Sequence, residues 1–182
     1  MRLFMAVVIA IMGAAMASAQ NGFRGPGLYE IMNLKSSRMM AIDTRDRASV
    51  IQIVSRSQED QRWVVEPGPG GTFFIRSAVN GRAIQITNNA QSTPVVCARF
   101  DRSPAQQWRI EPGKDGNPLI VSAAGGRALD VPEGSNREGV RIQIYDRNGD
   151  SNQRFVFHPI DERPDRDRER RGRWDRDDRG GR

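Results

Sequence analysis

Four polar and aromatic side chains in the C-terminal part of the chain could together bind a sugar. A sugar ring has hydroxyls that need hydrogen-bond partners and an apolar C–H face, so a site needs a carboxylate acceptor, amides and an aromatic plane. The chain offers Asp130 as the acceptor, Gln143 and Asn152 as the amides, and Tyr145 as the plane. Gln143 and Tyr145 are two residues apart, so the alternation of a β-strand would put them on one face.

Each of these residues also has an ordinary structural explanation. Asp130 could cap a turn, Tyr145 could belong to a half-buried core, and Asn152 could sit in a tight loop. Catalytic alternatives have little support, because the chain has one histidine, His158, and one cysteine, Cys97. Ser-His-Asp and Cys-His arrangements therefore have at most one base, and a zinc site would need more ligands. We expect no enzyme activity and no cofactor.

A run of acidic and amide residues superficially matches a calcium-binding loop, with side chains at alternate positions: Asp146, Asn148, Asp150 and Asn152. The loop pattern requires a glycine where the chain has Ser151, and a glutamate where it has Phe157. We therefore expect no metal site. Asp130 and Asp146 stay open as a hydrolase pair, because a sequence gives no distance between two carboxylates.

The elements that would position these residues are indicated by a repeated triplet of Gln, any residue and an aromatic. The copies are Gln61-Arg62-Trp63, Gln106-Gln107-Trp108 and Gln153-Arg154-Phe155. The aromatic recurs after 45 residues (63 to 108) and again after 47 (108 to 155). A period of this size is typical of one supersecondary unit used three times.

Each unit also contains three other short apolar runs before its triplet. The first runs are 28–31, 72–75 and 118–121, the second are 40–43, 82–85 and 127–130, and the third are 50–54, 94–98 and 140–145. With the triplet segments these predict an all-β fold of about twelve short strands joined by Gly, Pro, Asn and Asp turns. The repeats span about 27–67, 71–112 and 116–159.

The two ends of the chain differ in composition from this middle part. Residues 1–19 have a positive start at Arg2, an apolar stretch and a small-residue cleavage pattern, which predicts a signal peptide and export to the periplasm or beyond. The alternative is a membrane anchor, although the apolar stretch is shorter than the roughly 20 residues a spanning helix needs. We expect the mature domain to cover residues 20–160, with no transmembrane span after the leader is removed.

Residues 161–182 include nine Arg and eight Asp or Glu, and Trp174 is their only large apolar residue. Such a segment is expected to be a disordered, solvated tail, with binding to an envelope component or nucleic acid as the alternative. Residues 20–160 carry 18 Lys or Arg and 14 Asp or Glu, a scattered excess of +4 that weakly favours acidic partners such as an anionic polysaccharide. Cys97 lies in a strand pattern, which favours a buried hydrophobe over a reactive thiol.

The three triplets, each preceded by an Ala-Leu-Asp-Val type motif, resemble the ricin-type lectin domain over about residues 27–159. The resemblance implies a pseudo-threefold β-trefoil, a six-stranded barrel capped by three hairpins, in which each unit can hold one shallow sugar site. It also implies that the triplet aromatic is structural and that the triplet Gln supports the loop, so we expect Trp63, Trp108 and Phe155 to lie in the core.

Matching the family's sugar site to each unit gives unequal results. The third unit keeps the whole set of carbohydrate-binding residues: Asp130, Gln143, Tyr145, Asn152 and Gln153. The first unit keeps Asp43, Gln52 and Gln61, but has Val54 at the ring position and Asp60 at the Asn position. The second unit has Gln85 at the Asp position, Val96 at the Gln position, Ala98 at the ring position and Ala105 at the Asn position.

The sequence therefore predicts one competent site, one doubtful site and one lost site. The resulting hypothesis is an exported carbohydrate-binding protein whose partner is a glycan or polysaccharide, with no specific nucleic-acid binding. The alternative is a β-trefoil scaffold that has lost sugar binding and mediates protein or envelope interactions. The identity of the sugar and the oligomeric state stay open.

Overall fold

The computed structural model describes residues 22–160 as an all-β domain. The signal peptide predicted for residues 1–19 and the tail predicted for residues 161–182 lie outside this described part. Each repeat contributes four strand positions. The first repeat has β1 (Gly27–Asn33), β2 (Met39–Ile42), β3 (Val50–Ile53) and β4 (Arg62–Pro67). The second has β5 (Phe73–Ser77), β6 (Ala83–Gln85), β7 (Thr93–Pro94), β8 (Val96–Ala98) and β9 (Trp108–Glu111). The third has β10 (Leu119–Ser122), β11 (Ala128–Asp130), β12 (Val140–Arg141), β13 (Gln143–Tyr145) and β14 (Phe155–Pro159).

These are fourteen strands rather than about twelve, because the third strand position of repeats two and three is divided in two. Val95 separates β7 from β8, and Ile142 separates β12 from β13. At these residues the backbone changes partner: β7 pairs with β13 and β12 with β3, whereas β8 and β13 pair within their own hairpins. The divided strands therefore connect neighbouring repeats.

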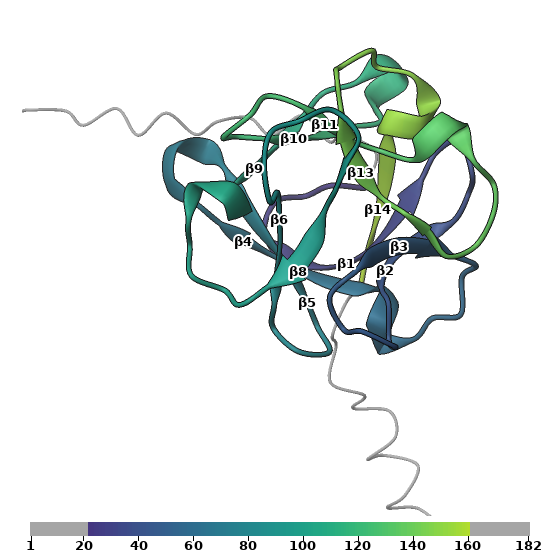
Figure 1. The fold of residues 1–182 in the computed structure, drawn as a ribbon, viewed down its shortest axis with the longest axis horizontal. Helices are drawn as coiled ribbons and strands as arrows, with labels where there is room; N and C mark the ends of the chain where they lie inside the picture. The colour runs from purple at the N-terminus through teal and green to yellow at the C-terminus, as the bar shows by residue number, and fades with distance from the viewer. Residues whose placement is uncertain (1–21, 161–182) are drawn as a thin grey trace, which may run out of the picture.

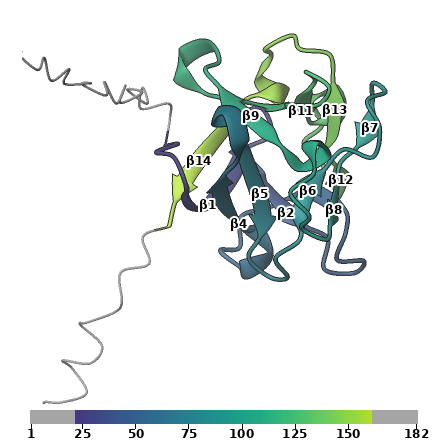
Figure 2. The ribbon, with the colours of Figure 1, turned by 90° about the vertical axis from the view of Figure 1, so that its left-hand side faces the viewer.

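Six strands form a closed barrel, and three hairpins cover one end of it. The barrel order is β1, β4, β5, β9, β10 and β14, with β14 returning to β1 and a single bridge from Leu119 to Arg154 joining β10 to the β14 side. The hairpins are β2 with β3, β6 with β8, and β11 with β13. Figure 1 shows the three repeats around a common centre, and Figure 2 shows the barrel strands on one side and the hairpin strands on the other. The β-trefoil expected from the sequence is confirmed.

The core repeats the same kinds of side chain in threes. Trp63, Trp108 and Phe155 are fully buried, and burying a ring of this size contributes on the order of 2 to 3 kcal/mol. The indole N–H of Trp63 donates to the carbonyl of Met40 (2.9 Å), and that of Trp108 donates to the carbonyl of Ile84 (3.0 Å). Phe155 fills the third place without a donor.

Short 3₁₀ turns precede the barrel strands that carry these rings. They are η1 (Glu59–Gln61), η3 (Pro104–Gln106) and η6 (Ser151–Gln153), and each ends on the Gln of a triplet. Three further turns, η2 (Pro69–Gly71), η4 (Lys114–Gly116) and η5 (Pro132–Gly134), lie in loops. Because η5 and η6 border the same hairpin of the third repeat, they shape the surface on which the candidate residues lie.

Candidate functional site

The third-repeat hairpin carries a polar cleft at the end of β11. Asp130 and Gln143 lie opposite each other in the antiparallel pairing of β11 and β13. Ile144 points into the core and is fully buried, so its neighbours Gln143 and Tyr145 face outward together. A cleft of about 420 Å³, named here the third-repeat cleft, is lined by Ser92, Asp130, Pro132, Glu133, Gln143, Tyr145, Asn148 and Asn152.

Asp130 is the best-supported polar group of the third-repeat cleft. Its Oδ1 accepts from Nε2 of Gln143 (2.9 Å), and its Oδ2 accepts from Nδ2 of Asn152 (2.7 Å) and Nε2 of Gln153 (3.1 Å). The side chain is only 3% exposed, and this burial raises the pKa of Asp130, while the three amide donors oppose the rise. A carboxylate offers about four lone-pair positions, so Oδ1 retains room for a ligand hydroxyl.

Gln153 supports this cleft from behind rather than lining it. It is fully buried, its Oε1 accepts from the N–H groups of Asn148 and Gly149, and its Nε2 donates to the Asp146 carbonyl as well as to Asp130. Sequence reasoning grouped Gln153 with the sugar-contacting residues, but its burial leaves it no free surface for a ligand. It is a positioning residue that joins the 146–149 loop to the carboxylate.

Asn152 is held by the backbone around it. Its Nδ2 donates to the Val131 carbonyl (3.2 Å) as well as to Asp130, and its own carbonyl accepts from the N–H of Val131 (3.1 Å). The buried Asn33 of the first repeat donates to the same Asn152 carbonyl (2.9 Å). These contacts fix the Asn152 side chain beside the carboxylate before any ligand arrives.

Four residues of the cleft were not predicted from the sequence. Asn148 lies in the acidic and amide run already noted for its calcium-like spacing, which could have indicated it. Pro132 and Glu133 come from the η5 turn, and Ser92 comes from the loop before β7 in the second repeat. Ser92 and Glu133 have φ values of 63° and 54°, an uncommon conformation for residues other than glycine that no sequence pattern announces.

The first repeat has an apolar cluster at the corresponding place. The tryptophan N–H bonds make Met40 equivalent to Ile84, so the next residues, Ala41 and Gln85, are equivalent to each other. Ala41 pairs with Ile51 as Gln85 pairs with Val96 and Asp130 with Gln143. The residues at the Asp130, Gln143 and Tyr145 positions are therefore Ala41, Ile51 and Ile53, which form a small buried cluster of their own.

The first-repeat match made from the sequence was therefore wrong in its alignment. Asp43 lies two residues beyond the acceptor position, and Gln52 lies one residue beyond the amide position, where it faces inward and is fully buried. Gln52 accepts from the hydroxyl of Ser36 (2.7 Å) and donates to the carbonyls of Ser135 (2.7 Å) and Arg137 (2.8 Å). It thereby joins the first repeat to the loop that follows η5.

Gln61, the third residue of that doubtful site, is also fully buried. Its Oε1 accepts from the N–H of Arg56 (2.9 Å), and its Nε2 donates to the carbonyl of Val54 (2.6 Å). These are the same relative positions, five and seven residues upstream, that Gln153 uses in the third repeat. Gln61 therefore supports the loop before its own strand, as Gln153 does in the third repeat.

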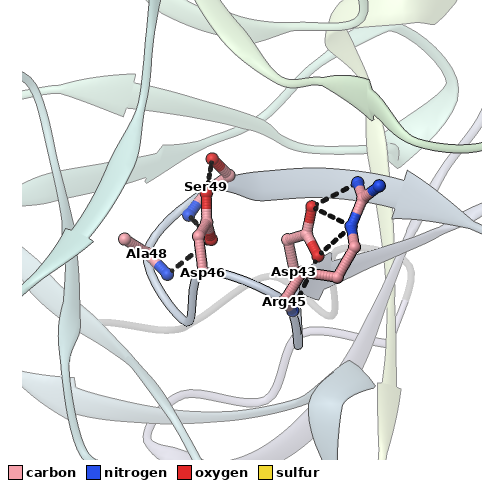
Figure 3. A network of polar contacts seen from close by, with 5 residues as sticks. All are labelled: Asp43, Arg45, Asp46, Ala48 and Ser49. Carbon is pink, nitrogen blue, oxygen red and sulfur yellow. Dashed lines mark hydrogen bonds and ion pairs between the residues drawn. The ribbon is translucent and has the colours of Figure 1, made fainter.

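Asp43 is occupied by an ion pair, as Figure 3 shows. The Arg45 guanidinium lies across both carboxylate oxygens, with a shortest distance of 2.6 Å, and this side-chain bond lowers the pKa of Asp43. In the same turn the hydroxyl of Ser49 donates to Asp46 (2.6 Å) and lowers the pKa of Asp46 to about 2. Both acids stabilise the β2–β3 turn locally.

The second repeat has neither a carboxylate nor a ring at its site positions. Gln85 accepts from Nε2 of the buried Gln106 (3.0 Å), and small or aliphatic residues fill the remaining places: Val96, Ala98 and Ala105. Within residues 22–160 no three His, Cys, Asp or Glu side chains gather as metal ligands would. In the same range, no helix is long and apolar enough to cross a membrane.

The closed barrel and the three hairpins define a β-trefoil domain. A family model described as "Ricin-type beta-trefoil lectin domain-like" matches residues 19–98 and 104–166, so the chain belongs to the ricin-type β-trefoil lectin family. Among curated protein sequences, none matches this chain.

Solved structures share the fold at low sequence identity. The designed threefold symmetric protein ThreeFoil has a TM-score of 0.71 at 23% identity, covering 74% of this chain and 99% of that one. The Macrolepiota procera ricin B-like lectin in complex with lactose has a TM-score of 0.69 at 20% identity, covering 76% and 99%. The C-half of the earthworm R-type lectin in complex with GalNAc has a TM-score of 0.58 at 20% identity, covering 74% and 100%.

Proposed function

We propose that this protein is an exported lectin that binds a glycan in the third-repeat cleft. The observation that carries the proposal is the convergence of Asp130, Gln143, Tyr145 and Asn152 on one open cleft from three separate segments. Asp130 would accept from a sugar hydroxyl through Oδ1. The side-chain amides of Gln143 and Asn152 would make further hydrogen bonds to the sugar, and Tyr145 would lie against the apolar face of the sugar ring. Export rests on the predicted leader.

A neighbouring depression favours a ligand longer than one sugar. It measures about 510 Å³ and shares Glu133, Asn148 and Asn152 with the third-repeat cleft, while Lys35 and Arg154 border its far part. A second sugar unit would therefore continue over η5 and η6. A monosaccharide alone should bind at around millimolar affinity, because exposed polar contacts contribute little net free energy.

The alternative function is a scaffold for protein or envelope partners that no longer binds sugar. The apolar cluster in the first repeat and the missing acceptor in the second favour it, since two of the three sugar positions have no carboxylate. The two functions differ in whether the third-repeat cleft binds any glycan.

A glycan array followed by calorimetry would decide between them. Lactose and GalNAc belong in the first set, because related folds hold these sugars. Asp130→Ala and Tyr145→Ala should each abolish binding, and circular dichroism should show that both variants remain folded. Gln85→Ala, at the Asp130 position of the second repeat, is the matched control and should bind like the parent. A folded parent that binds no glycan would favour the scaffold.

A further inference from the structure

A separate depression, in which three of the six lining residues are arginines, lies in the second repeat. It measures about 540 Å³ and is lined by Arg76, Asn80, Gly81, Arg82, Arg99 and Phe100. We name it the arginine pocket. It shares no residue with the third-repeat cleft, and none of its lining residues is acidic. Three of the basic residues that look scattered in the sequence are therefore gathered here, on β5, on the turn after it and on the segment after β8.

Arg76 forms the fixed wall of the arginine pocket. Its Nη1 donates to Glu66 (2.6 Å), its Nε donates to the carbonyl of Gly81 (3.0 Å), and its guanidinium lies 4.5 Å from the centre of the Phe100 ring. Phe100 in turn packs edge-on against the buried Phe74, with ring centres 5.1 Å apart. Glu66 balances the charge of Arg76, and the aromatic pair holds its plane in place.

Arg82 and Arg99 supply positive charge that no acid balances by contact. Arg82 donates to the carbonyl of Arg47 (3.1 Å), and across residues 22–160 neither Arg82 nor Arg99 lies within 4.0 Å of a carboxylate oxygen. The Arg102 guanidinium lies 5.4 Å from the centre of the Phe100 ring, and it too makes no ion pair within residues 22–160. The neighbouring acid is Asp101, which accepts from the N–H of Ser103 (2.9 Å).

From this geometry we propose that the arginine pocket is a second binding site, which takes the carboxylate or sulfate group of an acidic polysaccharide. Two guanidiniums with free N–H groups suit such a group, because their planar forks match pairs of oxygens. The choice of a saccharide over another anion rests on the proposed lectin function. The shape agrees with it, because the charge sits in one hollow, whereas nucleic acids are bound by a row of contacts along their phosphates.

Two sites of different chemistry would then act on one polymer. The third-repeat cleft has a carboxylate acceptor and suits neutral hydroxyls, while the arginine pocket suits an anionic substituent. A polysaccharide long enough to reach both would bind more tightly than a fragment that fills either, because the second contact becomes intramolecular.

The test compares two double variants with equal charge loss. Arg82→Gln with Arg99→Gln removes the free cations of the pocket, and Arg24→Gln with Arg137→Gln removes two exposed cations elsewhere. Fluorescence anisotropy of the full chain would use heparin, polygalacturonate, dextran and duplex DNA as probes. The parent should bind heparin or polygalacturonate, and any binding of the neutral dextran should be equal in the parent and in both double variants. The pocket variant should bind about tenfold more weakly or worse, and the control should change less than about twofold.

Several outcomes would overturn the second site, and they are separable from failure of the lectin proposal. Equal losses in both double variants would mean a general charge effect, DNA binding as tight as that of the polysaccharides would mean a nucleic-acid surface, and no binding to either acidic polymer would mean no site. Asp130→Ala should retain heparin binding, because the arginine pocket alone takes the anionic group, and the pocket variant should keep any binding to neutral sugars.

Discussion

Replacing Gln153 by Ala should weaken sugar binding although its side chain touches no ligand. The side chain makes two bonds to the N–H groups of Asn148 and Gly149 (3.0 and 3.3 Å), one to the Asp146 carbonyl (2.9 Å) and one to Asp130 (3.1 Å). Its removal frees the 146–149 loop and takes away one of the three donors that support the carboxylate.

The matched control is Gln61→Ala in the first repeat. Gln61 is equally buried and supports its own loop through Arg56 and Val54, but it has no bond to a site carboxylate. Removing two hydrogen bonds in Gln61→Ala and four in Gln153→Ala, at about 1 kcal/mol each and with a small cavity, should cost about 3 kcal/mol and about 5 kcal/mol of unfolding free energy respectively. The lost bond to Asp130 should cost only Gln153→Ala a further 1 kcal/mol or so of binding free energy, which is about fivefold in affinity.

Urea denaturation would measure the unfolding free energies, and calorimetry with the sugar found on the array would measure the affinities. Both variants should lose stability, Gln153→Ala by about 2 kcal/mol more, and only Gln153→Ala should lose affinity. Equal affinity losses would show that the effect comes from general loosening of the fold. An unchanged affinity in Gln153→Ala would refute the positioning role.

Four further predictions concern packing and ionisation. Trp63→Phe should cost about 2 to 4 kcal/mol of unfolding free energy, measured by denaturation, because a buried carbonyl loses its donor and the smaller ring leaves space. Burial raises the pKa of the Cys97 thiol to about 12, so a thiol reagent at about pH 8 should label it in urea and not in the native protein. Because the folded pKa of Asp46 is lowered to about 2, the stability that Asp46 contributes is present above about pH 4 and is lost as the pH falls toward 2. Denaturation at about pH 5 and about pH 3 should show that Ser49→Ala loses less unfolding free energy between these two pH values than the parent does. Burial raises the pKa of Asp130 above its ordinary 3.8, and the protonated carboxyl has lost an acceptor for a sugar hydroxyl. As the pH falls, calorimetry should therefore show sugar binding weakening at a higher pH than it would with an exposed carboxyl. The Asp130→Asn variant should show no such pH dependence.

The fold could be predicted from the sequence because its strongest signals are local and repeated. Trp63, Trp108 and Phe155 mark the same barrel position in each repeat, and alternation within the short runs indicates which side faces inward. The structure has fourteen strands rather than about twelve because the backbone changes its hydrogen-bonding partner strand at Val95 and at Ile142. This change depends on how the repeats meet and leaves no mark in the pattern of apolar residues along the sequence.

The acid of the first repeat was misaligned for a related reason. Side chains alternate with a period of two, so moving a strand by two residues keeps every side chain on its face and is invisible to a pattern. The acid of the first repeat comes at Asp43, two residues after the position that the register gives to Ala41. Only the hydrogen bonds of the hairpin and of the Trp63 indole fix that register. In the third repeat the acid lies at the position that the register gives to Ala41 in the first, opposite Gln143.

The contrast between these two repeats is itself an argument about function. Ala41, Ile51 and Ile53 fill the first-repeat position with apolar side chains, so the trefoil can form there without a charge. In the third repeat the same position holds Asp130, whose burial raises its pKa and which three amide side chains support. A buried ionised carboxylate costs stability unless it is fully bonded, and an apolar replacement often costs less. Folding therefore gives no reason for Asp130 to stand at the floor of an open cleft, whereas binding a hydroxylated ligand does.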